Sequence, residues 1–158
     1  ILLTREDFGL KSDLTSDCAP LADLVMRLYA AHLSPHVIRD ATRGGVGTVL
    51  YEIARQSGVG IRIKGSAVPV DPRVRGMCDL LGLEPLYLAC EGRLVLFARQ
   101  EEAPAILEVL QTSPYGQQAA VIGEVDADLA TGNVVVETEL GAPILLPQPT
   151  GELLPRIC

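Results

Sequence analysis

The sequence predicts an α/β sandwich, with helices packed on a mixed β-sheet and an extended, proline-rich segment at its end. Two observations lead to this fold class. Short apolar strands alternate with amphipathic helices along the chain, which is the pattern of a sheet covered by helices. Hydrophobic residues make up 48% and charged residues 21% of the sequence, as in folded globular proteins. The 158 residues suffice for one domain with a sizeable core.

Capping residues and apolar periodicity predict the elements of the first half. Ser16 or Asp17 is a good N-cap for the first helix, and Pro20 fits its first turn. The elements that follow are a strand over residues 36–40, a helix from about Val46 to Gln56, and an alternating strand over residues 59–64. A Ser-Gly pair ends the second of these helices, because glycine readily takes the left-handed conformation at a helix end.

The second half continues the alternation of helices and strands. Asp71 caps a helix over about residues 73–81. The remaining elements are a short apolar strand over residues 86–90, a buried strand over residues 94–98, a helix over about residues 101–112, and strands over residues 119–125 and 133–137. We expect the last two strands to form a terminal hairpin and all strands to belong to one sheet.

Prolines mark the end of the sequence, at Pro143, Pro147, Pro149 and Pro155. Such a segment cannot form a stable helix or join a central strand. We therefore divide the chain into an α/β domain over residues 1–142 and a flexible, polyproline-like tail over residues 143–158. The tail ends in Cys158, which places a thiol at the end of an extended arm. A terminal cysteine without a function is the alternative.

Charge and cysteine usage exclude several classes of protein. A net charge of -7 with scattered basic residues argues against nucleic acid as the main partner. The apolar runs are far shorter than a membrane span and no signal peptide is visible, so we expect no membrane association and a cytoplasmic protein with reduced thiols. No two cysteines have CxxC spacing, and only two histidines are present, so no metal site is expected. We expect Cys18 and Cys78 in the core.

A candidate binding loop lies between a predicted strand and the helix that follows it. The loop contains Asp40, Thr42, Arg43, Gly44 and Gly45. Free backbone N–H groups at a helix start form an anion site, and glycines let a ligand approach closely. The Arg43 guanidinium can bind phosphate or carboxylate oxygens, whereas Asp40 and Thr42 can cap the helix or hold a metal-bound water. An ordinary turn with a solvated arginine is the alternative.

Glu91 is a candidate general base, because it lies between two apolar strand segments and precedes Gly92. If its carboxyl group is partly buried there, its pKa rises and it can accept protons near neutral pH. The glycine leaves room for another backbone to approach. A turn residue that faces water is the alternative.

Several motifs resemble those of a known family. Asp-Ala-Thr-Arg-Gly-Gly over residues 40–45 resembles the C-terminal half of the aminoimidazole-ribonucleotide synthetase (PurM-like) superfamily. The motif over residues 83–92, Ile-Gly-Glu-Val over residues 122–125 and Leu-Pro-Arg-Ile-Cys over residues 154–158 are similar to those of one of its families, the HypE carbamoyl dehydratases of hydrogenase maturation. The resemblance covers essentially the whole chain, and the Pro-Arg-Ile-Cys ending is its most specific part.

The resemblance implies a function for the tail. In the HypE family the terminal cysteine accepts a carbamoyl group from the partner HypF. ATP then drives dehydration of the S-carboxamide to a thiocyanate, and the cyano group passes to iron on the HypC–HypD complex as a cyanide ligand of NiFe hydrogenase. By this resemblance Cys158 is the carrier, Glu91 is the candidate base, and the loop over residues 40–45 lies on the phosphate side of the ATP cleft.

The resemblance also implies that part of the family's protein is absent from this chain. The sequence starts without methionine, so we expect an N-terminal, ATP-binding domain to be missing. ATP with Mg²⁺ is then bound mainly by that domain, the full-length protein is a homodimer, and this piece alone is inactive. Two alternatives stay open. One is another enzyme of the superfamily, such as a selenophosphate synthetase or thiamine-phosphate kinase relative, and the other is a non-catalytic interaction domain with the tail as a docking peptide.

Overall fold

The structure is a computed structural model, and it describes residues 13–148. The helices of this part are α1 (Ala22–Ala30), α2 (Gly45–Ser57), α3 (Pro72–Leu81) and α4 (Ala103–Gln111). The strands are β1 (Val37–Asp40), β2 (Gly60–Lys64), β3 (Leu94–Phe97), β4 (Gly123–Asp126), β5 (Val134–Glu137) and β6 (Pro143–Leu145). Short 3₁₀ turns are η3 (Gly65–Ala67), η4 (Pro85–Tyr87) and η5 (Gln100–Glu102).

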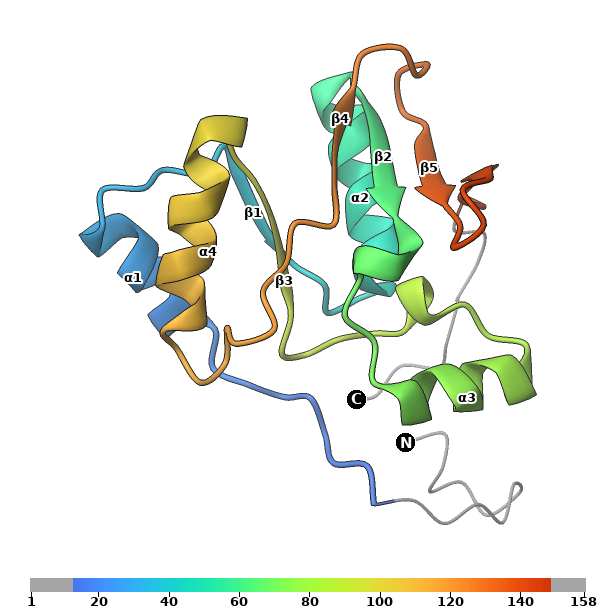
Figure 1. The fold of residues 1–158 in the computed structure, drawn as a ribbon, viewed down its shortest axis with the longest axis horizontal. Coiled ribbons are helices and arrows are strands. Elements are labelled where there is room, and N and C mark those ends of the chain that lie inside the picture. The colour runs from blue at the N-terminus through green and yellow to red at the C-terminus, as the bar shows by residue number, and fades with distance from the viewer. Residues whose placement is uncertain (1–12, 149–158) are drawn as a thin grey trace.

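The strands within residues 13–148 form two sheets instead of one. β1 and β3 pair antiparallel. The larger sheet has the order β4-β2-β5-β6, in which β2 and β5 are parallel and the other pairs are antiparallel. Figure 1 shows α2 against the larger sheet, and α1 and α4 side by side at the other end of the molecule. The predicted α/β fold, with helices packed on mixed sheets, is confirmed.

The predicted terminal hairpin is wrong, because β2 lies between β4 and β5. Two side chains of β2, Ile61 and Ile63, are almost fully buried. Buried backbone N–H and C=O groups are nearly always hydrogen-bonded. A strand this deep in the core therefore needs a neighbour on each edge, and β4 and β5 fill those two places.

The hydrophobic core consists of two clusters that share β3. The larger cluster lies between α2 and the larger sheet. The smaller cluster consists of four buried residues of α1 and α4, namely Leu24, Leu28, Ile106 and Leu110. Side chains alternate along a strand, so Val95 and Phe97 of β3 pack on the larger cluster and Leu94 and Leu96 pack on the smaller one. The small sheet therefore joins the two clusters.

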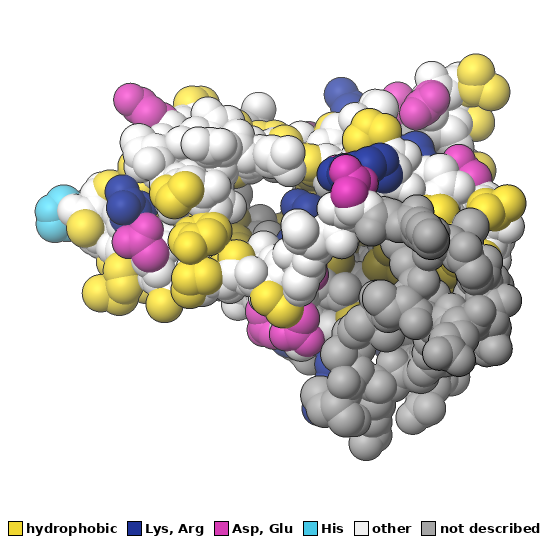
Figure 2. Space-filling view, turned by 90° about the horizontal axis from the view of Figure 1, so that it is seen from below, with side chains coloured by type: hydrophobic (Ala, Val, Ile, Leu, Met, Phe, Trp, Pro, Cys, Tyr) yellow, Lys and Arg dark blue, Asp and Glu magenta, His cyan; other side chains and the backbone are white. Residues whose placement is uncertain are grey.

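Exposed hydrophobic side chains gather at the end of the molecule that α1 and α4 form, as Figure 2 shows. Met26 and Tyr29 of α1 are 65% and 55% exposed. Single exposed apolar residues are normal on protein surfaces. Among residues 13–148, no helix has both the length and the apolar character needed to cross a membrane.

α1 starts later than the sequence predicts. The helix begins at Ala22 with Leu21 as its N-cap, and no side chain of the described residues caps it. The Ser16 hydroxyl group instead accepts a hydrogen bond from the Cys18 N–H at 3.3 Å, a local contact that competes with helix formation. Cys18 is exposed, so its predicted place in the core is wrong. Cys78 is buried as predicted, and burial raises the pKa of its thiol.

The predicted strand over residues 86–90 is also wrong. The chain forms η4 there, and the Glu84 carboxylate accepts a hydrogen bond from the Leu86 N–H at 3.2 Å. Pro85 fits the first position of a helical turn, since it has no N–H group to leave unpaired. Leu86 is 7% exposed and reaches the larger cluster from this turn.

The proline-rich segment starts inside the fold. Pro143–Leu145 form β6, which among residues 13–148 is an edge strand of the larger sheet, a position that tolerates proline. Leu146 is only 3% exposed. The tail predicted from residue 143 thus begins with residues that belong to the domain. Cys158 and the other residues after 148 lie outside the described residues.

Candidate functional site

The loop over residues 40–45 connects β1 to α2. Asp40 ends β1, and its carboxylate accepts a hydrogen bond from the Thr42 hydroxyl group at 2.6 Å. This hydrogen bond holds the pKa of the Asp40 carboxyl group below its ordinary value. Gly44 and Gly45 follow with φ angles of 68° and 66°, a left-handed conformation that glycine adopts easily and other residues rarely adopt. The glycine pair therefore makes the sharp entry into α2 possible.

The start of α2 has the features of an anion-binding site. Gly44 is the N-cap, and no side chain of the described residues caps the helix. The first turn of α2, all of which is described, contains no acidic side chain, so nothing in that turn neutralises the positive end of the helix dipole. Arg43 is exposed beside it. A phosphate or carboxylate can therefore meet backbone N–H groups and a guanidinium in one place.

The segment over residues 86–88 packs directly on the start of α2. Gly45 lies so close to the backbone carbonyls of this segment that a Cβ atom would overlap them. A Cβ atom on Gly47 would lie 2.7 Å from the ring of Tyr87. Both positions therefore require glycine for packing.

The turn formed by Glu91 and Gly92 lies beside the loop. The backbone of Ala41 binds both ends of this turn. The Cys90 N–H donates to the Ala41 carbonyl, and the Ala41 N–H donates to the Arg93 carbonyl, both at 3.1 Å. The structure thus brings the candidate base and the candidate binding loop together, although they are far apart in the sequence.

Glu91 is exposed within the described part of the chain, so its apolar neighbours do not bury the carboxyl group there. The condition given for a raised pKa is therefore not met by these residues. The space beside Gly92 is filled by the backbone of residues 17–19, because a Cβ atom on Gly92 would overlap the Asp17 carbonyl and lie 3.1 Å from the Ala19 nitrogen. That space is therefore closed to the tail.

Two tyrosine hydroxyl groups bind the chain immediately after β6. We call residues 146–148 the tail root. Tyr51 of α2 donates to the Leu146 carbonyl, and Tyr87 of η4 donates to the Pro147 carbonyl. Burial raises the pKa of Tyr51, and it raises the pKa of Tyr87 to about 12. Both hydroxyl groups therefore keep the proton that they donate at neutral pH.

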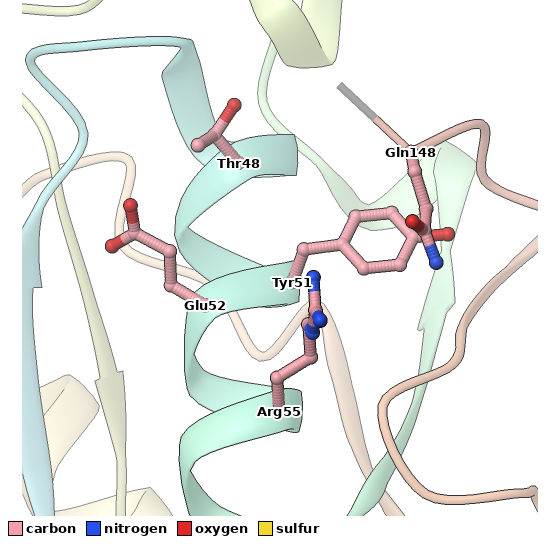
Figure 3. A pocket seen from close by; sticks show the side chains of 5 residues that line it. All are labelled: Thr48, Tyr51, Glu52, Arg55 and Gln148. Atoms are coloured by element: carbon pink, nitrogen blue, oxygen red, sulfur yellow. The ribbon is translucent and has the colours of Figure 1, made fainter. Parts of the chain in front are cut away.

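A hollow of about 200 Å³ lies beside the tail root on one face of α2. It is lined by Thr48, Tyr51, Glu52, Arg55 and Gln148. Figure 3 shows the Tyr51 ring pointing from α2 toward Gln148, with Arg55 below them. Ligand pockets usually measure about 300–1,000 Å³, so this hollow is too small to enclose a nucleotide.

The sequence did not identify Tyr51 and Tyr87 as site residues. Tyr51 has the spacing of an ordinary core residue of α2, and Tyr87 lies in a segment that was predicted to be a strand. A hydrogen bond from a side chain to a distant carbonyl leaves no pattern in the sequence. Within residues 13–148, no three His, Cys, Asp or Glu side chains come together as possible metal ligands.

Comparisons with known proteins agree with the family resemblance. Residues 3–135 match the family described as AIR synthase related protein, C-terminal domain. The carbamoyl dehydratases HypE of Rhodobacter capsulatus and Azotobacter vinelandii are each 44% identical to this chain over 158 residues. These alignments cover 100% of this chain and 46% of each relative, so the chain spans about half the length of the curated relatives it matches.

Solved structures share the fold. A crystal structure of the hydrogenase maturation protein HypE aligns with a TM-score of 0.91 and 44% identity, over 99% of this chain and 50% of that chain. A HypE structure in complex with ATP aligns with a TM-score of 0.90 and 42% identity, over 99% and 48%. A HypE–HypF complex aligns with a TM-score of 0.86 and 36% identity, over 94% and 48%. Because the family match spans most of the sequence and the fold agrees, this chain belongs to the AIR synthase related protein family, as its C-terminal domain.

Proposed function

We propose that this chain is the C-terminal half of a HypE-type carbamoyl dehydratase, which supplies the cyanide ligand of NiFe hydrogenase. One observation supports the proposal most. The segment over residues 86–93, which includes the turn at Glu91, contacts both the candidate binding loop, at Ala41 and Gly45, and the tail root, at Pro147. The named relatives that align with the whole chain support the same activity.

The proposed reaction takes place on the sulfur of Cys158, which carries a carbamoyl group, S–C(=O)–NH₂. The carboxamide oxygen is a poor leaving group, so the γ-phosphoryl group of ATP is transferred to it and ADP leaves. The two N–H protons are then removed, the C–O bond breaks, and the oxygen departs as part of phosphate. An S–C≡N thiocyanate remains on Cys158.

We assign roles to the described residues within this reaction. Arg43 and the N–H groups that follow Gly44 and Gly45 bind phosphate oxygens, which suits a helix start without a side-chain cap. The hydrogen bond between Thr42 and Asp40 shapes the turn ahead of the glycines. Glu91 is exposed among the described residues, so in this proposal its burial comes from other parts of the full-length protein, such as the half that this chain does not span.

The proposal includes ATP with Mg²⁺, bound mainly by that other half. A HypE structure in complex with ATP supports ATP as co-substrate, and a HypE–HypF complex supports HypF as the carbamoyl donor. The HypC–HypD complex as cyanide acceptor and a homodimeric full-length protein come from the family resemblance, and a cytoplasmic location comes from the sequence features given above.

Mass spectrometry of the full-length protein tests the proposal. After incubation with HypF, carbamoyl phosphate and ATP, we expect Cys158 to gain one carbamoyl group and then to lose one water. Cys158→Ala should show neither change, and Cys18→Ala, which removes another exposed thiol, should show both. An unmodified Cys158 in the wild-type protein would contradict the proposal and favour an interaction domain with a docking tail.

A further inference from the structure

The tail root is held by hydrogen bonds on successive carbonyl groups. Tyr51 binds the Leu146 carbonyl from α2, and Tyr87 binds the Pro147 carbonyl from η4. The Leu146 N–H also donates to the Val134 carbonyl at 2.9 Å, which extends the pairing with β5 beyond the end of β6. A chain that simply leaves a domain has its carbonyls hydrated, whereas these two have donors from the protein.

We propose that Tyr51 and Tyr87 are positioning residues, which set the point and direction in which the tail leaves the domain. This inference rests on the proposed function, because the cargo that it positions is the group on Cys158. In this proposal the two residues take no part in the chemical steps, and they act through the tail backbone.

Of the two contacts, the one between Tyr51 and Leu146 is buried, whereas the one between Tyr87 and Pro147 is exposed. Tyr51 is 4% exposed and Leu146 is 3% exposed, and both belong to the larger core cluster. A Tyr51 hydroxyl group without its partner would be a buried polar group with an unmade hydrogen bond, which is costly. The attached state is therefore strongly preferred over one in which the root lifts away.

The attachment also links the tail to the candidate phosphate loop. The Tyr87 ring lies against Gly47, and the carbonyls on either side of Tyr87 lie against Gly45. The residue that binds Pro147 is thus packed on the first turn of α2, which follows the loop over residues 40–45. One short segment therefore sets the distance between the start of the tail and the proposed site of phosphoryl transfer.

The attachment limits how far the thiol can travel. Cys158 lies ten positions after Gln148 in the sequence. A fully extended chain spans at most about 3.6 Å per residue, so the thiol stays within about 36 Å of the root. If the root and β6 came loose, the tether would start near Glu137 and be about twice as long. The effective concentration of the Cys158 thiol at its site falls roughly as the −3/2 power of tether length. Doubling the tether would therefore lower that concentration about threefold.

Loosening of the tail root should affect carbamoylation and dehydration of Cys158 differently. Dehydration takes place within the protein, so it depends on where the tail starts. Carbamoylation comes from a separate protein, and a longer tether does not hinder it. A looser root should therefore slow the second step and spare the first.

The test uses Tyr51→Phe, Tyr87→Phe and the double variant in the full-length protein. Hydrogen exchange should show the Leu146 amide exchanging about 3- to 10-fold faster in each single variant, in proportion to one lost hydrogen bond. Amides of β2 should keep wild-type rates. Dehydration of carbamoylated Cys158 should slow in the double variant by roughly 1.5-fold if only the root comes loose and by about threefold if β6 also separates, whereas carbamoylation should stay unchanged.

Matched controls separate positioning from general destabilisation. Tyr29→Phe and Tyr115→Phe remove hydroxyl groups from tyrosines that are 55% and 50% exposed, and both should behave like the wild type. Gly47→Ala displaces the Tyr87 ring while keeping its hydroxyl group, so it should also loosen the root. Gly76→Ala adds a Cβ atom to α3 where nothing lies within 4 Å, and it should leave the tail root attached.

Three outcomes decide the inference. Wild-type exchange at Leu146 in the double variant would show that the hydroxyl groups do not hold the root. Faster exchange with a wild-type dehydration rate would remove the positioning role. If the wild-type protein forms no adduct on Cys158, the proposed function fails and the positioning role fails with it, whereas the exchange measurement still shows whether the root is held.

Discussion

Gly45 is a residue at which backbone conformation and packing both require glycine. Its φ of 66° disfavours other residues, and the carbonyls of Leu86 and Leu88 leave no space for a Cβ atom. Gly58 has nearly the same φ, 65°, but nothing lies within 4 Å of its Cβ position. Comparing alanine variants at the two positions therefore separates the penalty of a positive φ from the penalty of a steric clash.

We predict that Gly45→Ala lowers the free energy of unfolding by roughly 2–4 kcal/mol, as the sum of a left-handed alanine and an overpacked contact. Gly58→Ala should lower it by only about 1–2 kcal/mol, since the conformational penalty remains without the clash. Urea unfolding of both variants measures the difference. Equal losses would mean that the segment over residues 86–88 moves aside at no cost.

Glu91 is the residue at which the proposed chemistry can be tested most directly. Its exposed carboxylate lies in the turn that is bound to Ala41. In the full-length protein, Glu91→Gln should accept the carbamoyl group on Cys158 at the wild-type rate. Dehydration should be roughly 10²–10⁴-fold slower, the usual contribution of a general base. The mass of the Cys158 adduct over time follows the two steps separately.

The control for this prediction is Glu101→Gln, which removes an exposed carboxylate from η5, outside the turn at Glu91. It should leave both steps unchanged. A wild-type dehydration rate in Glu91→Gln would mean that Glu91 is a structural turn residue. The base would then have to come from the other half of the protein.

At the scale of elements, Asp71 caps the start of α3 and makes the stability of the fold depend on pH. The Asp71 carboxylate accepts hydrogen bonds from the Arg73 N–H at 2.8 Å and from its guanidinium at 3.0 and 2.8 Å. These bonds lower the pKa of Asp71 from 3.8 to about 2. Because the pKa is lower in the folded state, the ionised carboxylate stabilises the fold above pH 3.8, and this contribution disappears as the pH falls through about 2.

We predict that Asp71→Asn lowers the urea midpoint at neutral pH, because the amide can still cap the helix but no longer pairs with the guanidinium of Arg73. The difference from the wild type should shrink steadily below pH 3.8. Asp79→Asn, on an exposed position of the same helix, is the control and should have little effect. A difference that persists unchanged to pH 2 would contradict the role of the charge.

At the scale of the whole molecule, the two core clusters behave as one unit if β3 joins them. Leu28 is 1% exposed in the smaller cluster. Leu28→Ala should therefore lower the free energy of unfolding by about 2–5 kcal/mol. Because β3 contributes side chains to both clusters, unfolding should remain a single transition by fluorescence and by circular dichroism.

Leu80→Ala is the matched control, since Leu80 is 68% exposed on α3. It should change stability by less than about 0.5 kcal/mol. Two separate transitions in Leu28→Ala would show that the α1–α4 end unfolds independently of the larger sheet.

The features of this protein that are set by residues close together in the sequence, such as helix bounds and caps, were predictable from the sequence alone. α2 and α3 lie close to their predicted bounds, and Asp71 is the cap that was expected. The motifs also indicated the family, which the family match confirms. Helix caps, turns and apolar periodicity act over a few residues, so their physical causes are present in the local sequence.

Only the tertiary structure decided which distant residues meet. The place of β2 between β4 and β5, the exposure of Glu91, and the hydrogen bond from Tyr51 to Leu146 all depend on chain segments far from one another. Such contacts form because burial of the whole apolar surface selects one arrangement of strands, and that choice is made jointly by all the segments. No single stretch of sequence therefore determines the arrangement of the strands. The attachment of the tail root to α2 and η4 depends on this arrangement, and it matters for the proposed function.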